Sequence, residues 1–174
     1  MEELKSFIRN VPDFPKPGIQ FKDVTTLFED RYGFQMCLDA FESILRYMPF
    51  DKIAGVESRG FVLAAPMADR LNCGLVLIRK QGKLPGETIS QSYDLEYGTD
   101  ALEMHVGTVK PGERVLIMDD LLATGGTLEA AASLVRQLGG KVEAIACIIE
   151  LIGLNGRDKL GDTPFITLLN YLEE

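Results

Sequence analysis

The chain has 174 residues, 46% of them hydrophobic, and its 18 Lys and Arg against 26 Asp and Glu give a formal net charge of −8. This length and apolar content predict a single globular domain and exclude an intrinsically disordered chain. The acidic pI of about 4.8 argues against a binder of duplex DNA or anionic membranes, because both normally need Lys and Arg gathered on one face.

The first part of the chain is predicted to hold two helices joined by an ordered arm. The first helix is expected over residues 2–9. The second is expected over about residues 32–48, where Phe34, Leu38 and similar residues recur at helical spacing. Between them, residues 11–18 contain three prolines and cannot continue a helix.

From residue 52 onward, short apolar runs alternate with amphipathic segments, as in a parallel sheet covered by helices. Strands are expected over residues 52–56, 74–78, 114–118 and 142–150, and helices over residues 61–71 and 127–138. The predicted fold class is therefore α/β, a single domain whose central, mostly parallel, twisted sheet is flanked by helices.

Residues 80–109 break this alternation with a polar stretch that contains glycine. They predict a β-hairpin with strands near residues 92–97 and 101–106, part of it mobile. Residues 82–92 are the expected lid, because they contain Gly82, Pro85 and Gly86 and few apolar residues.

The segment VLIMDDLLATGGT, residues 115–127, is the central motif. It places Asp119 and Asp120 at the carboxyl end of a buried strand, the edge where open α/β sheets bind ligands. In the loop that follows, Gly125 and Gly126 allow backbone N–H groups to turn toward one point, at the start of a helix. This arrangement predicts a cradle for a monophosphate, to which the hydroxyl of Thr124 can also donate.

Carboxylates beside a phosphate site need another task, because they repel the phosphate. They can accept hydrogen bonds from a diol or hold Mg²⁺, so a ribose 5-phosphate fits both ends of the motif. The alternative is that Asp119 and Asp120 only end the strand and the glycines only form a turn. Two carboxylates after an apolar strand are costly without ligands, which favours the binding site.

Several other kinds of site are not indicated. Residues 55–60 have the glycine spacing of a P-loop, but Phe61 and Val62 stand where Lys and Ser or Thr are needed. No GxGxxG motif suggests a nicotinamide cofactor. The three cysteines lie far apart and indicate neither a disulfide framework nor a zinc site. No signal peptide or membrane-spanning run is recognisable, so the expected location is the cytoplasm.

The central motif resembles the signature of the type I phosphoribosyltransferases, enzymes that use 5-phosphoribosyl 1-pyrophosphate (PRPP). Further segments narrow the resemblance to the adenine phosphoribosyltransferases. They are DFPKPG (13–18), FKD (21–23), ESRGF (57–61), IRKQGKLP (78–85) and SYDLEYG (92–98). The resemblance runs over nearly the whole chain and implies a base-binding arm within residues 1–30 and a flexible flap over residues 80–106.

The resemblance implies the reaction of adenine with PRPP to give AMP and pyrophosphate, in purine salvage. It also implies a homodimer, no nucleic-acid or membrane partner, and Mg²⁺ held by the pyrophosphate and water with no direct protein ligand. Two alternatives stay open: a transferase for another purine base, and a non-catalytic PRPP-sensing regulator. The regulator would need a DNA-binding module or a basic RNA-binding face, and neither is visible in the sequence.

The resemblance also assigns roles to individual residues. Asp119 and Asp120 would contact the ribose hydroxyls. The 5′-phosphate would bind Ala123, Thr124, Gly125, Gly126 and Thr127. The pyrophosphate would bind Glu57, Ser58, Arg59, Gly60, Arg79 and Lys83, with a non-proline cis peptide bond at Glu57–Ser58.

For adenine, the resemblance implies stacking between Phe21 and Leu151, with main-chain groups of Gln20 and Lys22 reading the edge of the base. Lys22 stands where arginine is usual in the family, and Gln20 stands where an apolar residue is frequent. The alternative for Phe21 is a simple anchor of the arm.

The catalytic candidates are Arg59 and Lys80 for charge neutralisation, and Glu96 and Tyr97 as acid/base and orienting groups. Glu96 could instead face solvent on the hairpin, and the basic cluster of residues 79–83 could be a solvated turn.

Overall fold

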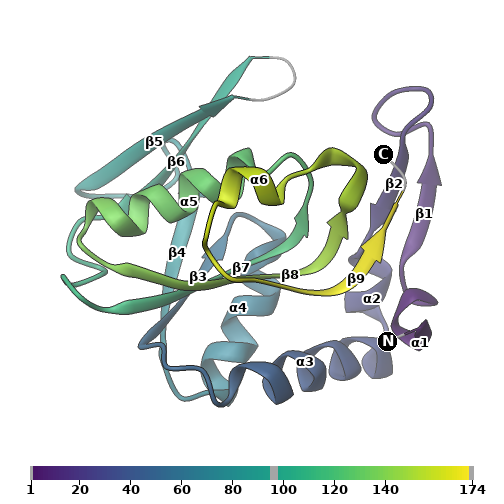
Figure 1. Ribbon diagram of the computed structural model, residues 1–174, viewed down its shortest axis with the longest axis horizontal. Coiled ribbons are helices and arrows are strands. Elements are labelled where there is room, and N and C mark those ends of the chain that lie inside the picture. The colour runs from purple at the N-terminus through teal and green to yellow at the C-terminus, as the bar shows by residue number, and fades with distance from the viewer. Residues whose placement is uncertain (1, 95–97, 173–174) are drawn as a thin grey trace.

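The computed structural model describes residues 2–94 and 98–172, and these form a seven-stranded sheet in the order β5-β6-β4-β3-β7-β8-β9 (Figure 1). The strands are β3 (Lys52–Val56), β4 (Gly74–Lys80), β5 (Thr88–Asp94), β6 (Thr99–His105), β7 (Arg114–Leu122), β8 (Lys141–Leu151) and β9 (Phe165–Tyr171). Strands β4, β3, β7, β8 and β9 are parallel, whereas β5 and β6 continue the sheet as an antiparallel hairpin. The α/β prediction is confirmed.

Helices cover both faces of the sheet (Figure 1). The longer ones are α3 (Arg31–Leu45) and α4 (Arg59–Arg70) on one face and α5 (Gly126–Gln137) on the other, where the short α6 (Arg157–Leu160) also lies. This double cover explains why β7 and β8 are apolar on both sides. Among the described residues, no helix is long and apolar enough to cross a membrane.

The N-terminal arm is a two-stranded antiparallel hairpin between short helices. It consists of α1 (Glu2–Lys5), β1 (Arg9–Pro12), β2 (Gln20–Asp23) and α2 (Thr25–Glu29). The prediction of a helix over residues 2–9 is wrong beyond Lys5. Residues 9–12 pair instead with β2, and the Arg9 guanidinium contacts the Asp23 carboxylate across the pair. Tertiary pairing has therefore overridden a local helical pattern.

Other boundaries also differ from the prediction. Strand β7 runs on to Leu122, so that Asp119 and Asp120 lie within it, and Asp119 pairs with Cys147 of β8. The first strand of the hairpin starts at Thr88, which leaves only residues 82–87 of the predicted lid outside regular structure. Strand β9 and the 3-10 helix η1 (Ile152–Leu154) were not predicted.

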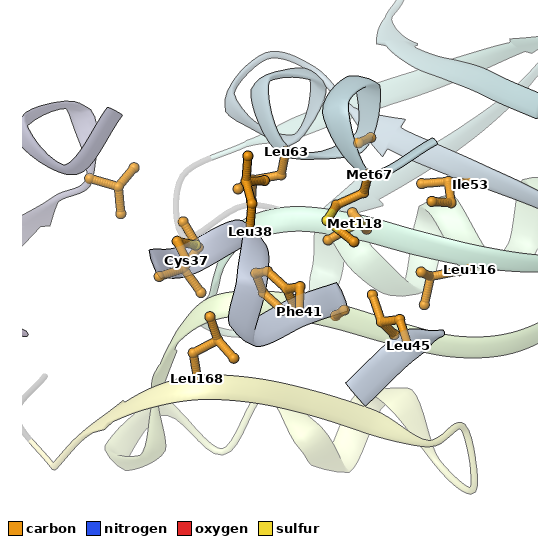
Figure 2. Packing of buried hydrophobic residues seen from close by; sticks show 14 of the residues in the cluster. Cys37, Leu38, Phe41, Leu45, Ile53, Leu63, Met67, Leu116, Met118 and Leu168 are labelled. Carbon is orange, nitrogen blue, oxygen red and sulfur yellow. The ribbon is translucent and has the colours of Figure 1, made fainter. Parts of the chain in front are cut away.

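The core between α3, α4 and the sheet fixes the frame that carries the loops. Phe41 is fully buried there, among Leu38 and Leu45 of its own helix and Met118 of β7 (Figure 2). Met118 directly precedes the acidic pair, so this packing anchors the part of β7 from which both carboxylates project.

We expect Phe41→Ala to destabilise the fold by about 3 to 5 kcal/mol, because it removes a buried ring and leaves a cavity between α3 and the sheet. Urea unfolding would measure the change. Tyr47→Ala is the control, since Tyr47 is 85% exposed and its loss is expected to change the free energy of unfolding by less than about 0.5 kcal/mol. Equal losses in the two variants would contradict this account of the core.

Candidate functional site

A cavity of about 490 Å³ opens at the carboxyl ends of β3 and β7. Its walls are the turn after β3, the end of β7 with the loop to α5, and the near side of the β5–β6 hairpin. It brings together the predicted residues Glu57, Ser58, Arg59, Lys80, Asp119, Asp120, Ala123, Thr124, Gly125, Gly126 and Thr127. Residues separated by up to 70 positions in the sequence therefore share one site.

The acidic pair lies on the cavity wall with little exposure, 8% for Asp119 and 5% for Asp120. Oδ1 of Asp119 accepts a hydrogen bond from the backbone N–H of Asp120 at 2.9 Å. Burial and the neighbouring Asp120 charge raise the pKa of Asp119 well above its ordinary value. The site thus holds two acids close together, and the charge of Asp119 costs the folded chain stability.

Arg59, in the first turn of α4, supplies the counter-charge. Its guanidinium forms an ion pair with the Asp120 carboxylate. Partial burial lowers the pKa of Arg59, but the charges of Asp120 and Asp119 outweigh burial and raise it. Asp23 at the end of β2 also raises the pKa of Arg59 through its charge, which links the N-terminal arm to this side of the cavity.

The loop from β7 to α5 has the backbone required for an anion cradle. Gly125 has φ +82°, a left-handed conformation that L side chains rarely adopt, and it is the N-cap of α5. At Gly126 space is tight instead, since a Cβ there would lie 3.2 Å from the carbonyl oxygen of Asp94. The helix therefore begins with N–H groups facing the cavity and with its positive dipole end beside them.

Gly60 lies behind the cavity and sets the distance between α4 and β7. A Cβ at Gly60 would lie 2.6 Å from the carbonyl oxygen of Met118 and 3.1 Å from Oδ1 of Asp119. Only a residue without a side chain lets the helix start approach the acidic pair this closely. The peptide bond Glu57–Ser58 just before it is cis, as predicted.

The side chain of Glu57 contacts the end of β4. Its carboxylate accepts hydrogen bonds from the Arg79 guanidinium, at 3.0 and 3.2 Å, and from the backbone N–H of Lys80, at 2.8 Å. Burial raises the pKa of Glu57, but these hydrogen bonds outweigh burial and lower it. Arg79 also donates to the carbonyl oxygen of Lys83, and neither Arg79 nor Lys83 lines the described part of the cavity.

Two polar cavity residues were missed by the sequence analysis, Tyr93 on β5 and Asp100 on β6. The Lys80 ammonium lies 3.3 Å from Oδ2 of Asp100, and the Tyr93 hydroxyl donates to the same oxygen. Burial raises the pKa of Tyr93, and a hydrogen bond with the Thr127 side chain partly offsets this. Correct strand boundaries would have revealed both residues, because they are cross-strand partners.

The four predicted base-binding residues lie apart from the cavity walls, in the arm and at the end of β8. The Lys22 ammonium lies 4.8 Å from the centre of the Tyr171 ring, and Tyr171 is the β9 partner of Leu151. The side chain of Gln20 accepts a hydrogen bond from Asn10, and the ring of Phe21 packs edge-on against Phe14.

The two remaining catalytic candidates, Glu96 and Tyr97, lie outside the described residues. The described chain on either side is the β5–β6 hairpin, and Tyr93 lines the cavity two positions before the gap begins.

Comparison with known proteins identifies the family of the chain. Residues 25–163 match the family model of the phosphoribosyl transferase domain. The adenine phosphoribosyltransferase of Desulforamulus reducens is 53% identical over 167 residues, which are 96% of this chain and 97% of that protein.

Solved structures agree with the sequence relatives. The crystal structure of adenine phosphoribosyltransferase from Thermoanaerobacter pseudethanolicus is 50% identical, with a TM-score of 0.95 over 98% of this chain and 99% of that one. The Saccharomyces cerevisiae enzyme, solved with adenine and an imino-altritol bisphosphate, is 40% identical, with a TM-score of 0.91 over 97% of each chain.

The raised pKa of Asp119 predicts that Asp119→Asn stabilises the fold at pH 7. A carboxyl group whose pKa rises on folding costs stability at pH values above its unfolded pKa, 3.8, and costs nothing below it. We therefore expect a thermal midpoint several degrees above that of the unmodified protein at pH 7, and a difference that shrinks toward pH 4. Asp69→Asn, which changes an exposed carboxylate on α4, is the control. A lower midpoint for Asp119→Asn at pH 7 would contradict the burial cost.

Proposed function

Because the chain belongs to the phosphoribosyltransferase family, and within it to the adenine phosphoribosyltransferases, we propose that it transfers the 5-phosphoribosyl group from PRPP to adenine. The products are AMP and pyrophosphate, and the reaction serves purine salvage. The observation that carries this proposal is the arrangement of Asp119 and Asp120 beside the loop 123–127 in one cavity. A diol and a phosphate on one sugar need this combination of acceptors and donors.

In the proposed complex the carboxylates of Asp119 and Asp120 accept hydrogen bonds from the ribose 2′ and 3′ hydroxyls. The 5′-phosphate accepts hydrogen bonds from the backbone N–H groups of residues 123–127 and from the hydroxyls of Thr124 and Thr127. Fixing the sugar at both ends aligns its anomeric carbon with the incoming base.

The pyrophosphate end belongs to Ser58, Arg59, Gly60 and Lys80. In the structure, Arg59 forms an ion pair with Asp120. An anionic ligand can replace Asp120 as the partner of the guanidinium, while the ribose hydroxyls donate hydrogen bonds to the carboxylate. Such an exchange leaves the guanidinium beside an anion and the carboxylate with hydrogen-bond donors, which limits the desolvation cost.

Arg79, Lys83 and Glu57 act beside this end of the site. Glu57 holds Arg79 and the backbone N–H of Lys80, so it fixes the direction of the strand end that presents Lys80. Arg79 and Lys83, at the start of the flap, add positive charge near the departing pyrophosphate.

Mg²⁺ fits this site as an ion carried by the substrate. In the described part of the chain, no three acidic, His or Cys side chains cluster to hold a metal. The oxygen-rich wall formed by Asp119 and Asp120 nonetheless suits a hard, hydrated cation bound mainly by pyrophosphate and water. When bound, the ion would neutralise negative charge that develops on the leaving pyrophosphate.

For adenine we propose main-chain recognition by β2. The side chains of Gln20 and Lys22 both bond to Asn10 of β1, so they are occupied within the arm. Strand β2 pairs with β1 along one edge in a two-stranded sheet, and its other edge offers N–H and C=O groups to the base. Phe21 and Leu151 provide the apolar faces for the ring.

Transfer then proceeds by attack of adenine N9 on the anomeric carbon as the bond to pyrophosphate breaks, through an oxocarbenium-like transition state. The bonding electrons leave with the pyrophosphate, and the base loses a proton. Glu96 is the proposed acceptor of that proton and Tyr97 its orienting partner. Their place in the sequence supports this role, since Tyr93, three positions before Glu96, lines the cavity wall.

We also propose a homodimer that uses the outer part of β4 and the adjoining side of α4. Strand β6 pairs with β4 only at Arg79 and Lys80, in the register that the structure describes. Val76 and Ile78 face α5, so Leu75 and Leu77 point to the opposite side, where they are 41% and 39% exposed. Together with Val62 of α4, also 39% exposed, they form an apolar face that a second copy would cover.

A cytoplasmic location remains a prediction from the sequence.

The direct test is to supply PRPP and Mg²⁺ with adenine, hypoxanthine, guanine or xanthine, one base at a time. We expect AMP and pyrophosphate in equal amounts with adenine, at a rate at least about 100-fold above the other bases, because the buried main-chain groups are left unpaired by a wrong base edge. Chromatography of nucleotides would measure the products. Faster turnover of an oxopurine would overturn the adenine assignment, and no turnover of any base would overturn the enzyme assignment.

A second test concerns the proton acceptor. Glu96→Gln keeps the size of the side chain but removes its basicity, so we expect kcat for AMP formation to fall by about 10² to 10³, with the KM for PRPP within about twofold. Steady-state kinetics would measure both constants. Unchanged kcat would remove Glu96 from the mechanism and leave water as the acceptor.

A further inference from the structure

A turn at residues 155–157 lies directly behind the phosphate loop. Gly156 is buried in this turn, between η1 and α6. Its backbone angles, φ −60° and ψ −26°, are those of ordinary right-handed helix, which any residue adopts without strain. Glycine is therefore not needed here for its conformational freedom.

Glycine is needed at this position for space. A Cβ at Gly156 would lie 2.1 Å from the carbonyl oxygen of Ala123 and 2.8 Å from Cδ1 of Leu122. In the opposite direction, a Cβ at Gly125 would lie 2.4 Å from the carbonyl oxygen of Gly156. The backbone of the turn and the backbone of the phosphate loop are thus in direct contact, and a glycine on each side makes this possible.

An ion pair between half-exposed Arg157 and buried Glu150 holds the turn in place. The Arg157 guanidinium donates to both carboxylate oxygens of Glu150, at 2.5 and 2.6 Å. Glu150 is only 5% exposed and is the β8 partner of Leu122, the residue just before the loop. Arg157 also lies over the Phe165 ring of β9, 4.8 Å from its centre. A two-point contact of this kind fixes direction as well as distance.

We propose that Gly156, held by the Arg157–Glu150 pair, is a positioning residue that sets the direction of the N–H groups in the loop 123–127. Gly156, Arg157 and Glu150 do not line the described cavity, so they act on the ligand through the loop. A side chain at position 156 would push the Ala123 carbonyl away and turn the peptides that follow it. The N–H groups would then no longer converge on one phosphate, and displacements of about 1 Å cost about 10²-fold in well-oriented sites. This inference rests on the proposed function, because it assigns that loop to the 5′-phosphate.

The test compares ligands for the two ends of the site in Gly156→Ala. Ribose 5-phosphate probes the phosphate loop, and pyrophosphate with Mg²⁺ probes the opposite end, both by isothermal titration calorimetry. We expect the Kd of ribose 5-phosphate to rise by at least about tenfold and that of pyrophosphate to stay within about twofold. Gly74→Ala is the matched control, since a Cβ there would meet Lys52 Cγ at 3.4 Å, an ordinary contact far from the cavity, and it should change neither Kd.

Arg157→Lys provides a second variant if Gly156→Ala does not fold. Lysine keeps the charge beside Glu150 but loses the two-point contact, so we expect the Kd of ribose 5-phosphate to rise by about three- to tenfold, again without an effect on pyrophosphate. Unchanged binding of ribose 5-phosphate, or equal losses for both ligands, would overturn the positioning role. If the unmodified protein formed AMP but these variants bound ribose 5-phosphate normally, only this inference would fail. If the unmodified protein formed no AMP, the proposed function would be overturned as well.

Discussion

The site depends on two adjacent carboxylates kept almost out of water at the end of a central strand. Asp119 and Asp120 would repel each other, and burial alone disfavours their charge. Arg59 offsets part of this cost through its ion pair with Asp120. The pair can persist because the frame around it is rigid: Met118 is buried in the core beside Phe41 (Figure 2), and the sheet registers of β7 hold both neighbouring strands.

The second constraint is that backbone segments approach one another closely around the site. At each of these contacts a glycine makes the close approach possible. Gly60 brings the start of α4 onto β7, and the pair Gly125 and Gly156 lets the loop and the turn behind it touch. In two of these three positions the backbone angles are ordinary, so steric space, and not left-handed conformation, explains the residue. The backbone of the loop 123–127, the proposed anion cradle, is therefore positioned by contacts on the side away from the cavity.

The sequence predicts the frame of the molecule better than its edges. The apolar runs in β3, β7 and β8 were predicted correctly because strands buried on both faces carry a strong signal. The N-terminal hairpin and β9 were missed, because these strands are stabilised by pairing with another strand and not by a pattern within the segment itself. The family and the cis bond at Glu57–Ser58 were predicted from the resemblance and are confirmed.

Tyr93 and Asp100 could not be predicted from residue type, because their position depends on the register of the hairpin. Gly156 likewise carries no local signal.

Charge pairing explains how a chain with a net charge of −8 can accept a polyanion. Three basic side chains at the proposed pyrophosphate end each have an acidic partner: Arg59 with Asp120, Arg79 with Glu57, and Lys80 with Asp100. These partners hold the cations in place before any ligand arrives, and they compete with the ligand once it binds. Partly exposed ion pairs contribute only about 0 to 1 kcal/mol each. A substrate with several negative charges can therefore displace the acidic partners from the cations. When the product leaves, the same acids can pair with the cations again. In the proposed function, an acidic protein thus has a local anion site whose cations are preorganised by their acidic partners.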